Sequence, residues 1–177
     1  MGVRLGAGAT LVLLTLALPV WAAATAPAFT LRLLDQKKTF DSRSLLGKKV
    51  LVVRFQASWC KVCVREAPAF ERLYREYKGR SVEFVAVQVQ DALADARKFL
   101  RAHRASYLAG LDPDLRIANR FGFKDAPETV VISQKGEIAA RFSGPSSAAE
   151  LAKAIDRLLP GRKKADRLSH GFTRAVS

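Results

Sequence analysis

The sequence is poor in the residues that cross-link proteins or bind metals. It has two cysteines, two histidines and one methionine, the initiator Met1. Cys60 and Cys63 are three residues apart, so neither is left for a long-range structural disulfide. There is no second Cys pair, and His103 and His170 are isolated, so the four ligands of a structural zinc site cannot be assembled. We therefore expect no resident metal.

Acidic residues are also in short supply. The 177 residues include 30 Lys and Arg against 16 Asp and Glu, which gives a formal net charge of +14. The cations are spread along most of the chain, and no nucleic-acid-binding motif accompanies them. We therefore interpret them as a basic, solvated surface and expect no nucleic-acid partner. A hydrophobic fraction of 49% is enough for the core of one domain without disulfide cross-links.

The N-terminal segment has no charged residue between Arg4 and Arg32. Within it, Thr10–Val20 is an almost continuous apolar run that small alanines follow. This pattern is typical of a secretory signal peptide, so we predict a leader over residues 1–24 with cleavage before Thr25. An uncleaved membrane anchor stays open, because the uncharged stretch reaches the roughly 20 residues that cross a bilayer. Both alternatives put the remainder across the membrane and predict a periplasmic location.

One globular domain is expected over residues 27–159. Hydrophobic periodicity and turn residues predict strands at 29–33, 49–55, 82–89, 129–133 and 137–142, and helices at 60–78, 93–103, 114–121 and 147–159. This order predicts an α/β fold in which a mixed central sheet is flanked by helices on both faces. The remaining segment, 160–177, is basic and lacks apolar periodicity, which predicts a disordered tail. Contact of this tail with anionic lipid or an acidic partner is the alternative.

The most informative segment is Trp59-Cys60-Lys61-Val62-Cys63, which follows a predicted strand and opens a predicted helix. Two residues between cysteines on a first helical turn bring both sulfurs to disulfide distance. The unpaired N–H groups and the positive end of the helix dipole stabilise a thiolate on the first cysteine, and Lys61 adds a cation. We therefore predict that Cys60 is the attacking nucleophile and that Cys63 resolves the mixed disulfide. A purely structural disulfide would close too small a loop to stabilise the fold much.

Several short segments, spread along the chain in a fixed order, match motifs of a known protein family. They are Ala26–Leu31, Gly47–Val53, Ala57–Glu66 with its WCxxCxxE pattern, Pro68 within the following helix, and Asp125–Thr129 with the letters APET. Through them the chain from Pro27 to about Leu159 resembles the TlpA-like disulfide reductases, which include the ResA and CcmG (DsbE) proteins of cytochrome c maturation. The resemblance implies a thioredoxin-like fold. It also implies a redox-active Cys60–Cys63 disulfide and no other cofactor.

The resemblance assigns roles to further residues. Pro127 would be the cis-proline that faces the cysteines, and the exposed backbone of Ala126 would pair with a substrate peptide as an extra strand. Glu66 would be the acidic residue near Cys63 that raises a thiol pKa or passes a proton, or else a plain first-turn carboxylate. Glu128 would either contact substrate or be a surface charge. Trp59 would pack beside the disulfide and shield it, next to the substrate.

Two positions depart from the family pattern. The dipeptide Lys61-Val62, which tunes the redox potential, lacks the proline common in the family. Arg54 stands six residues before Cys60, where thioredoxin has a buried acid. A cation near the sulfurs would favour the thiolate and make the pair more oxidising. The alternative is that Arg54 points away into solvent.

The leading functional hypothesis is a periplasmic enzyme that reduces disulfides in exported, cysteine-containing proteins, apocytochrome c among them. It would receive electrons from a membrane donor of the DsbD/CcdA type and work as a monomer. The second hypothesis is a DsbA-like thiol oxidase or isomerase whose potential is raised by Lys61, Arg65 and Arg54. A third is a Cu(I)-binding, metallochaperone-like protein, although the extra His or Met of such a site is missing.

Overall fold

The computed structural model describes residues 24–35 and 37–159. The predicted leader up to residue 23 and the predicted tail from residue 160 lie outside these residues. Within the described ranges, no helix is long and apolar enough to span a membrane.

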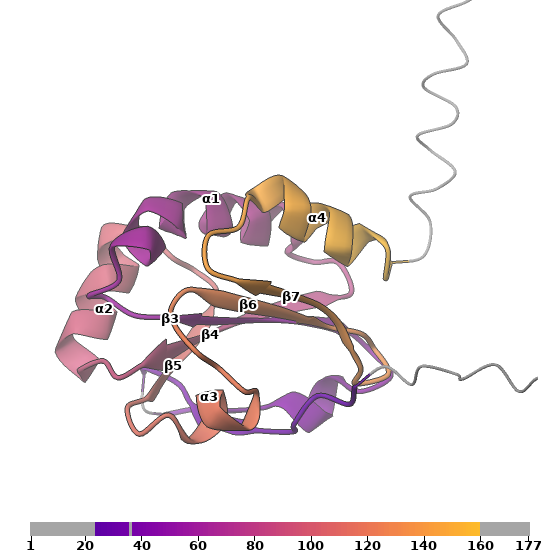
Figure 1. The fold of residues 1–177 in the computed structure, drawn as a ribbon, viewed down its shortest axis with the longest axis horizontal. Coiled ribbons are helices and arrows are strands. Elements are labelled where there is room, and N and C mark those ends of the chain that lie inside the picture. The colour runs from indigo at the N-terminus through magenta and orange to yellow at the C-terminus, as the bar shows by residue number, and fades with distance from the viewer. Residues whose placement is uncertain (1–23, 36, 160–177) are drawn as a thin grey trace, which may run out of the picture.

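A five-stranded mixed sheet forms the centre of the domain (Figure 1). Its strand order is β5-β4-β3-β6-β7, with bounds Leu108–Asp112, Val82–Val89, Val50–Gln56, Glu128–Ile132 and Ile138–Ser143. Strands β3, β4 and β5 are parallel to one another, and β6 is antiparallel to both of its neighbours, β3 and β7. All seven residues of β3 are buried, because this apolar strand lies in the middle of a sheet that is covered on both faces.

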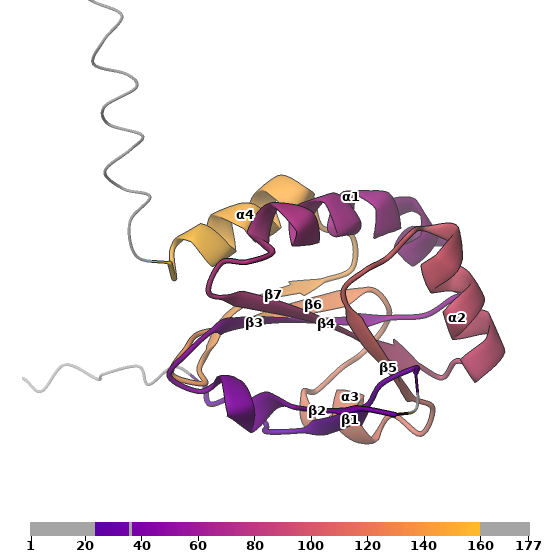
Figure 2. The same cartoon turned by 180° about the vertical axis from the view of Figure 1, so that it is seen from behind.

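Helices cover both faces of the sheet, as the sequence predicts. Figures 1 and 2 show α1 (Lys61–Tyr77) and α4 (Ala148–Asp156) together on one face. The opposite face carries the short helix α3 (Arg116–Arg120), the two-stranded ribbon of β1 (Thr30–Arg32) and β2 (Thr39–Asp41), and the 3-10 turn η1 (Ser42–Leu45). Helix α2 (Leu93–Ala102) lies at the end of the sheet where α1 begins. The architecture is a thioredoxin-like fold.

Two apolar clusters hold these layers together. Beneath α1 and α4, the cluster includes Val52, Phe70, Leu73, Phe84 and Leu151. On the other face, aromatic rings dominate: Phe55 packs on Phe121 and Phe123, and Phe121 packs on Phe29, with centroids 5.4–5.7 Å apart. The two cysteines belong to this second cluster, so the redox pair is continuous with the core.

Hydrophobic periodicity did not predict two of the strands, β2 and β5. Strand β5 has the sequence Leu-Ala-Gly-Leu-Asp, which is short and poor in residues that favour strands. Its conformation depends on tertiary pairing with β4 on one side and on the bridge from Leu33 to Gly110. Strand β2 has three residues and forms only by pairing with β1.

Glu71 ties α1 to the connection between α2 and β5. Its buried carboxylate accepts hydrogen bonds from the backbone N–H and the hydroxyl of Ser106, at 2.8 and 2.7 Å, and from Nε of Arg75 at 2.7 Å. Burial by itself raises the pKa of Glu71, but the hydrogen bonds from Ser106 and the charge of Arg75 outweigh it and hold this pKa below its ordinary value of 4.5. The ionised carboxylate therefore stabilises the fold.

We expect Glu71→Gln to lower the free energy of unfolding at pH 7 by about 1–3 kcal/mol, because three donors lose a charged acceptor. A carboxyl group whose pKa is lower in the folded protein stabilises the fold at pH values above its ordinary pKa. This contribution is lost as the pH falls from the ordinary pKa through the lower pKa of the folded state. The wild-type stability should thus fall below about pH 4.5 more steeply than that of the variant. Urea unfolding between pH 3 and 7 measures both effects. Asp114→Asn, at an exposed carboxylate, is the control, and an equal acid slope in wild type and Glu71→Gln would contradict the argument.

Candidate active site

The redox cysteines lie where β3 passes into α1. Cys60 is the N-cap residue of α1, and its Sγ accepts a hydrogen bond from the backbone N–H of Cys63 at 3.1 Å. The two residues form a disulfide with a Cα–Cα distance of 5.2 Å. Both side chains are buried, Cys63 fully and Cys60 to 5% exposure. After reduction, the same N–H group and the helix N-terminus would stabilise a thiolate on Cys60.

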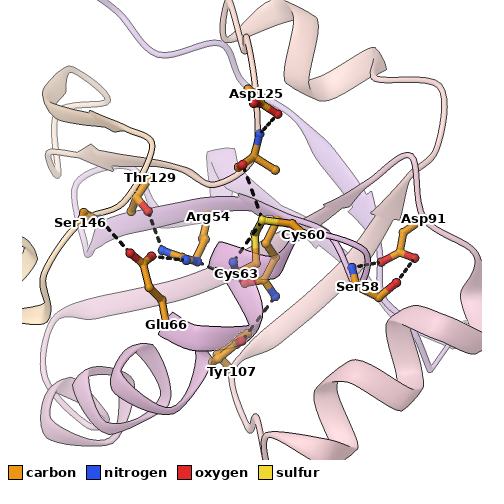
Figure 3. The surroundings of a disulfide bond; sticks show 12 residues. Arg54, Ser58, Cys60, Cys63, Glu66, Asp91, Tyr107, Asp125, Thr129 and Ser146 are labelled. Atoms are coloured by element: carbon orange, nitrogen blue, oxygen red, sulfur yellow. Dashed lines mark hydrogen bonds and ion pairs between the residues drawn. A yellow bond between two sulfur atoms is a disulfide. The ribbon is translucent and has the colours of Figure 1, made fainter.

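The loop before β6 lies directly against Cys60 (Figure 3). The Ala126–Pro127 peptide bond is cis, as predicted, and the carbonyl oxygen of Ala126 lies 3.5 Å from Sγ of Cys60. In the disulfide this sulfur has no proton to donate, so the approach is a contact that becomes a hydrogen bond only in a protonated thiol. The N–H of Ala126 donates to Oδ1 of Asp125 at 2.7 Å. A substrate strand that pairs with both backbone groups of Ala126 therefore has to displace the Asp125 side chain.

Arg54 is the centre of a buried polar network behind the cysteines (Figure 3). Its side chain is 1% exposed, and Nη2 forms an ion pair with Oε2 of Glu66 at 2.8 Å. The guanidinium also donates to Oγ1 of Thr129 at 3.3 Å and to Oε1 of Gln56 at 3.2 Å, and it lies 4.9 Å from the ring centroid of Phe70. The alternative in which Arg54 points into solvent is therefore wrong.

Glu66 is fully engaged through its two oxygens. Oε2 binds Arg54, and Oε1 accepts the backbone N–H of Ser146 at 3.0 Å, in the turn that leads into α4. It is thus more than a plain first-turn carboxylate, since it joins α1 to β3 and to the α4 turn. Its role in proton transfer to or from Cys63 stays a prediction.

Comparison with known proteins agrees with this geometry. The family model described as Redoxin matches residues 22–157. The chain belongs to the Redoxin family. HelX, a thiol:disulfide interchange protein of Rhodobacter capsulatus, is 32% identical over 137 residues, which cover 77% of this chain and 76% of HelX. The thiol-disulfide oxidoreductase ResA of Halalkalibacterium halodurans is 31% identical over 107 residues, 60% of each chain.

Among solved structures, this Redoxin domain is similar to a secreted disulfide oxidoreductase of Mycobacterium tuberculosis that is described as homologous to E. coli DsbE. The TM-score is 0.66 at 25% identity, over 73% of this chain and 96% of that chain. The family resemblance drawn from the WCxxCxxE and APET segments is confirmed. With a CxxC pair in a thioredoxin fold, the protein is a thiol–disulfide oxidoreductase.

The Redoxin domain exposes two apolar side chains close in sequence to Cys60. Trp59 is 54% exposed and Val64 is 39% exposed. The Trp59 indole N–H donates to the carbonyl oxygen of Gln90 at 3.1 Å, which fixes the ring at the surface. Lys61 is also exposed, and Val62 is half-buried. The contact of Trp59 with substrate, and the tuning role of Lys61 and Val62, stay predictions.

Glu128 is 1% exposed and forms an ion pair with Arg141 across the β6–β7 hairpin. The alternative of a surface charge is therefore wrong. Burial raises the pKa of Glu128, and the charge and hydrogen bond of Arg141 offset part of this rise. Glu128 could contact a substrate only if the residues that cover it moved away.

Sequence reasoning missed Asp91, which holds the segment before the cysteines. Its Oδ2 accepts the backbone N–H of Ser58 and its Oδ1 accepts the Ser58 hydroxyl, both at 2.7 Å. Asp91 follows β4, and Ser58 follows β3. The carboxyl ends of adjacent parallel strands meet at one edge of the sheet. The polar residue that follows each of these strands could therefore have indicated this contact from the sequence.

We expect Asp91→Ala to cost about 1–3 kcal/mol of stability, because it leaves two donors of the Ser58 segment without their acceptor. It should also slow disulfide exchange, since Cys60 follows this segment directly. Ser58→Ala removes only one of the two hydrogen bonds and is the milder, matched control. Thermal unfolding and the rate of reduction of a model disulfide measure the two effects, and equal behaviour of both variants would contradict this assignment.

Among the residues that the structure describes, no three His, Cys, Asp or Glu side chains form a group that could hold a metal ion.

Proposed function

We propose that the protein is an extracytoplasmic disulfide reductase that acts on exported, cysteine-containing proteins, apocytochrome c among the candidate substrates. The thiol–disulfide chemistry is that of the family. The observation that supports reduction of substrates, as opposed to their oxidation, is the ion pair of Arg54 with Glu66. An unpaired buried cation behind the cysteines would stabilise thiolates and make the couple oxidising. Because Glu66 neutralises this cation at 2.8 Å, that reason to expect an oxidase is removed.

The reaction proceeds by two exchanges. The thiolate of reduced Cys60 attacks one sulfur of a substrate disulfide, which forms a mixed disulfide and releases the other substrate sulfur as a thiolate that takes up a proton. Cys63 then loses its proton and attacks Sγ of Cys60, which restores the Cys60–Cys63 disulfide and releases the second substrate sulfur. In sum, two electrons pass from the enzyme to the substrate, and the two released substrate sulfurs take up the proton that Cys63 gives up and one further proton from solvent.

The surface around Cys60 supports recognition of an extended peptide. The carbonyl oxygen of Ala126 lies against Sγ of Cys60, and this backbone offers the pairing groups for an added strand. Trp59, which precedes Cys60 directly in the chain, has an exposed ring that could provide an apolar contact. Specificity for a particular protein would come from residues that flank the substrate cysteine.

The proposed location rests on the apolar leader over residues 1–24 and on the relative from Mycobacterium tuberculosis that is described as secreted. Each turnover leaves the enzyme oxidised, so a reductase outside the cytoplasm needs a supply of two electrons per cycle. A membrane donor of the DsbD/CcdA type would meet this need. A monomer is sufficient for this chemistry.

Trapping the thiol state in cells tests the direction of electron flow. Cells that make the protein are quenched in acid, and free thiols are alkylated with a maleimide that adds mass. We expect Cys60 and Cys63 to be mostly reduced, and to become oxidised when the membrane donor is deleted. A pair that is fully oxidised in growing cells with the donor present would contradict the reductase proposal.

Fractionation of the same cells tests the location. We expect the protein in the periplasmic or membrane fraction, with a mature N-terminus at Thr25 if the leader is cleaved. A cytoplasmic protein that retains Met1 would overturn this part of the proposal.

A thiol oxidase or isomerase is the second candidate. The exposed cation of Lys61, next to Cys60 at the N-terminus of α1, favours it, because both features stabilise the thiolate. The trapping experiment separates the reductase from the oxidase, since an oxidase is kept in its disulfide form in the cell.

A further inference from the structure

Arg54 lies in an unusual environment for a cation. It occupies the central strand β3, its side chain is 1% exposed, and it is six residues upstream of the nucleophile Cys60. Removing an arginine from water is costly unless its charge and its donors are matched. The structure meets this requirement with one charged partner, Glu66, and three weaker ones.

The partners of the guanidinium come from three elements. Helix α1 supplies the Glu66 carboxylate and the Phe70 ring, β6 supplies the Thr129 hydroxyl, and β3 itself supplies Gln56. Of these, only Glu66 carries a charge. Tyr107 reaches the network through the amide of Gln56, at 3.4 Å, and burial raises the pKa of Tyr107 above its usual value, so it is a neutral phenol.

The pair is close to the redox centre because of helical geometry. Cys63, Glu66 and Phe70 lie at positions i, i+3 and i+7 of α1, which places them along one side of the helix. Arg54 contacts the second and the third of these residues, so its charge lies about one helical turn from Cys63. Figure 3 shows the guanidinium between Glu66 and the cysteines.

We propose that Arg54 and Glu66 act as one electrically neutral unit that sets the reduction potential of the Cys60–Cys63 couple. Either charge alone would shift this potential, and the two shifts have opposite signs. A lone Arg54 cation stabilises the thiolates of the reduced form and raises the potential. A lone Glu66 carboxylate disfavours the thiolates and lowers it. Arg54 is thus a positioning residue, since it does not touch the reacting sulfurs.

The test is a set of four variants of the full chain, equilibrated with glutathione redox buffers at pH 7. We expect Glu66→Gln to shift the exchange equilibrium about tenfold toward the dithiol, which raises the potential by about 30 mV. Arg54→Met should shift it about tenfold toward the disulfide, which lowers the potential by about 30 mV. The double variant Arg54→Met/Glu66→Gln and the charge-conserving Arg54→Lys should both stay close to wild type.

A matched control pair lies on the same sheet. Lys49 and Glu83 also form an ion pair at 2.8 Å, but at the opposite end of β3 from the cysteines. Lys49→Met and Glu83→Gln should leave the potential unchanged. A role confined to fold stability would lower the unfolding temperature of the single variants without opposite shifts of the potential. Shifts of the same sign, or no shift in folded single variants, would overturn the proposal.

If a single variant fails to fold, Arg54→Lys and the double variant still decide the matter. The exchange equilibrium with glutathione is then compared between these two variants and wild type. If it differs more than tenfold from wild type in the double variant but not in Arg54→Lys, the pair does not act as a neutral unit. The inference rests on the proposed function only through the Cys60–Cys63 couple. A high wild-type potential would overturn the reductase direction, but the opposite shifts in the variants would still be expected.

Discussion

Cys60→Ser is expected to lower the rate of disulfide reduction by more than about three orders of magnitude, because no other described group can replace the nucleophile. The reason is geometric as well as chemical. Cys60 is the residue that caps α1, and it is the cysteine whose Sγ contacts the carbonyl oxygen of Ala126. Cys63 is fully buried, so a substrate sulfur cannot reach it in this arrangement. The measurement is the reduction of a fluorescent model disulfide under a constant supply of dithiothreitol.

Cys63→Ser provides the contrast. This variant retains the nucleophile but cannot resolve the mixed disulfide, so a covalent complex with substrate should accumulate on non-reducing gels and disappear with reductant. Cys60→Ser should form no such complex. If Cys63→Ser were inactive without trapping substrate, and Cys60→Ser trapped it instead, the assignment of the two roles would be reversed.

Gly110→Ala has the largest expected effect on stability. An added Cβ would lie 2.5 Å from Cγ of Leu31 and closer still to the backbone carbonyl oxygen of Arg32. The carbonyl cannot move without breaking the contact of β1 with β5, which includes the bridge from Leu33 to Gly110. We expect a loss of about 3 kcal/mol, the upper part of the range for overpacking, measured by urea unfolding.

Gly79→Ala is the control for this substitution. Gly79 has a positive φ of 84°, and nothing lies within 4 Å of a Cβ added there. It should therefore cost about 1 kcal/mol, from backbone strain alone. A Gly110→Ala variant as stable as wild type would show that β1 does not pack on β5 as the structure has it.

The site was predictable where its signals were local. The strand 50–56, the CxxC pair and the helix after it follow one another within 30 residues, so periodicity and spacing fix their relation. The segment around Pro127 was located by its resemblance to a family, and its position opposite Cys60 depends on the pairing of β3 with β6. That pairing joins residues more than 70 positions apart, which no local pattern specifies.

The ionic partners were beyond local reasoning. The sequence left open whether Arg54 points into solvent, and the structure decides this because all seven residues of β3 are buried. The partner of Arg54, Glu66, is identified only once α1 packs on the sheet. In the same way, Glu128 pairs with Arg141 because a hairpin aligns β6 with β7. Strand β5 depends on its neighbours, because Ala-Gly-Leu has little strand preference of its own.

The reduction potential of the wild-type Cys60–Cys63 couple decides whether the protein can work as a reductase. The full chain is equilibrated against glutathione or dithiothreitol buffers, and the dithiol fraction is measured after acid quenching and alkylation. The account predicts a reversible two-electron couple with a potential near or below that of thioredoxin, about −270 mV. A value near about −120 mV, the range of the strong oxidant DsbA, would contradict the assignment as a reductase.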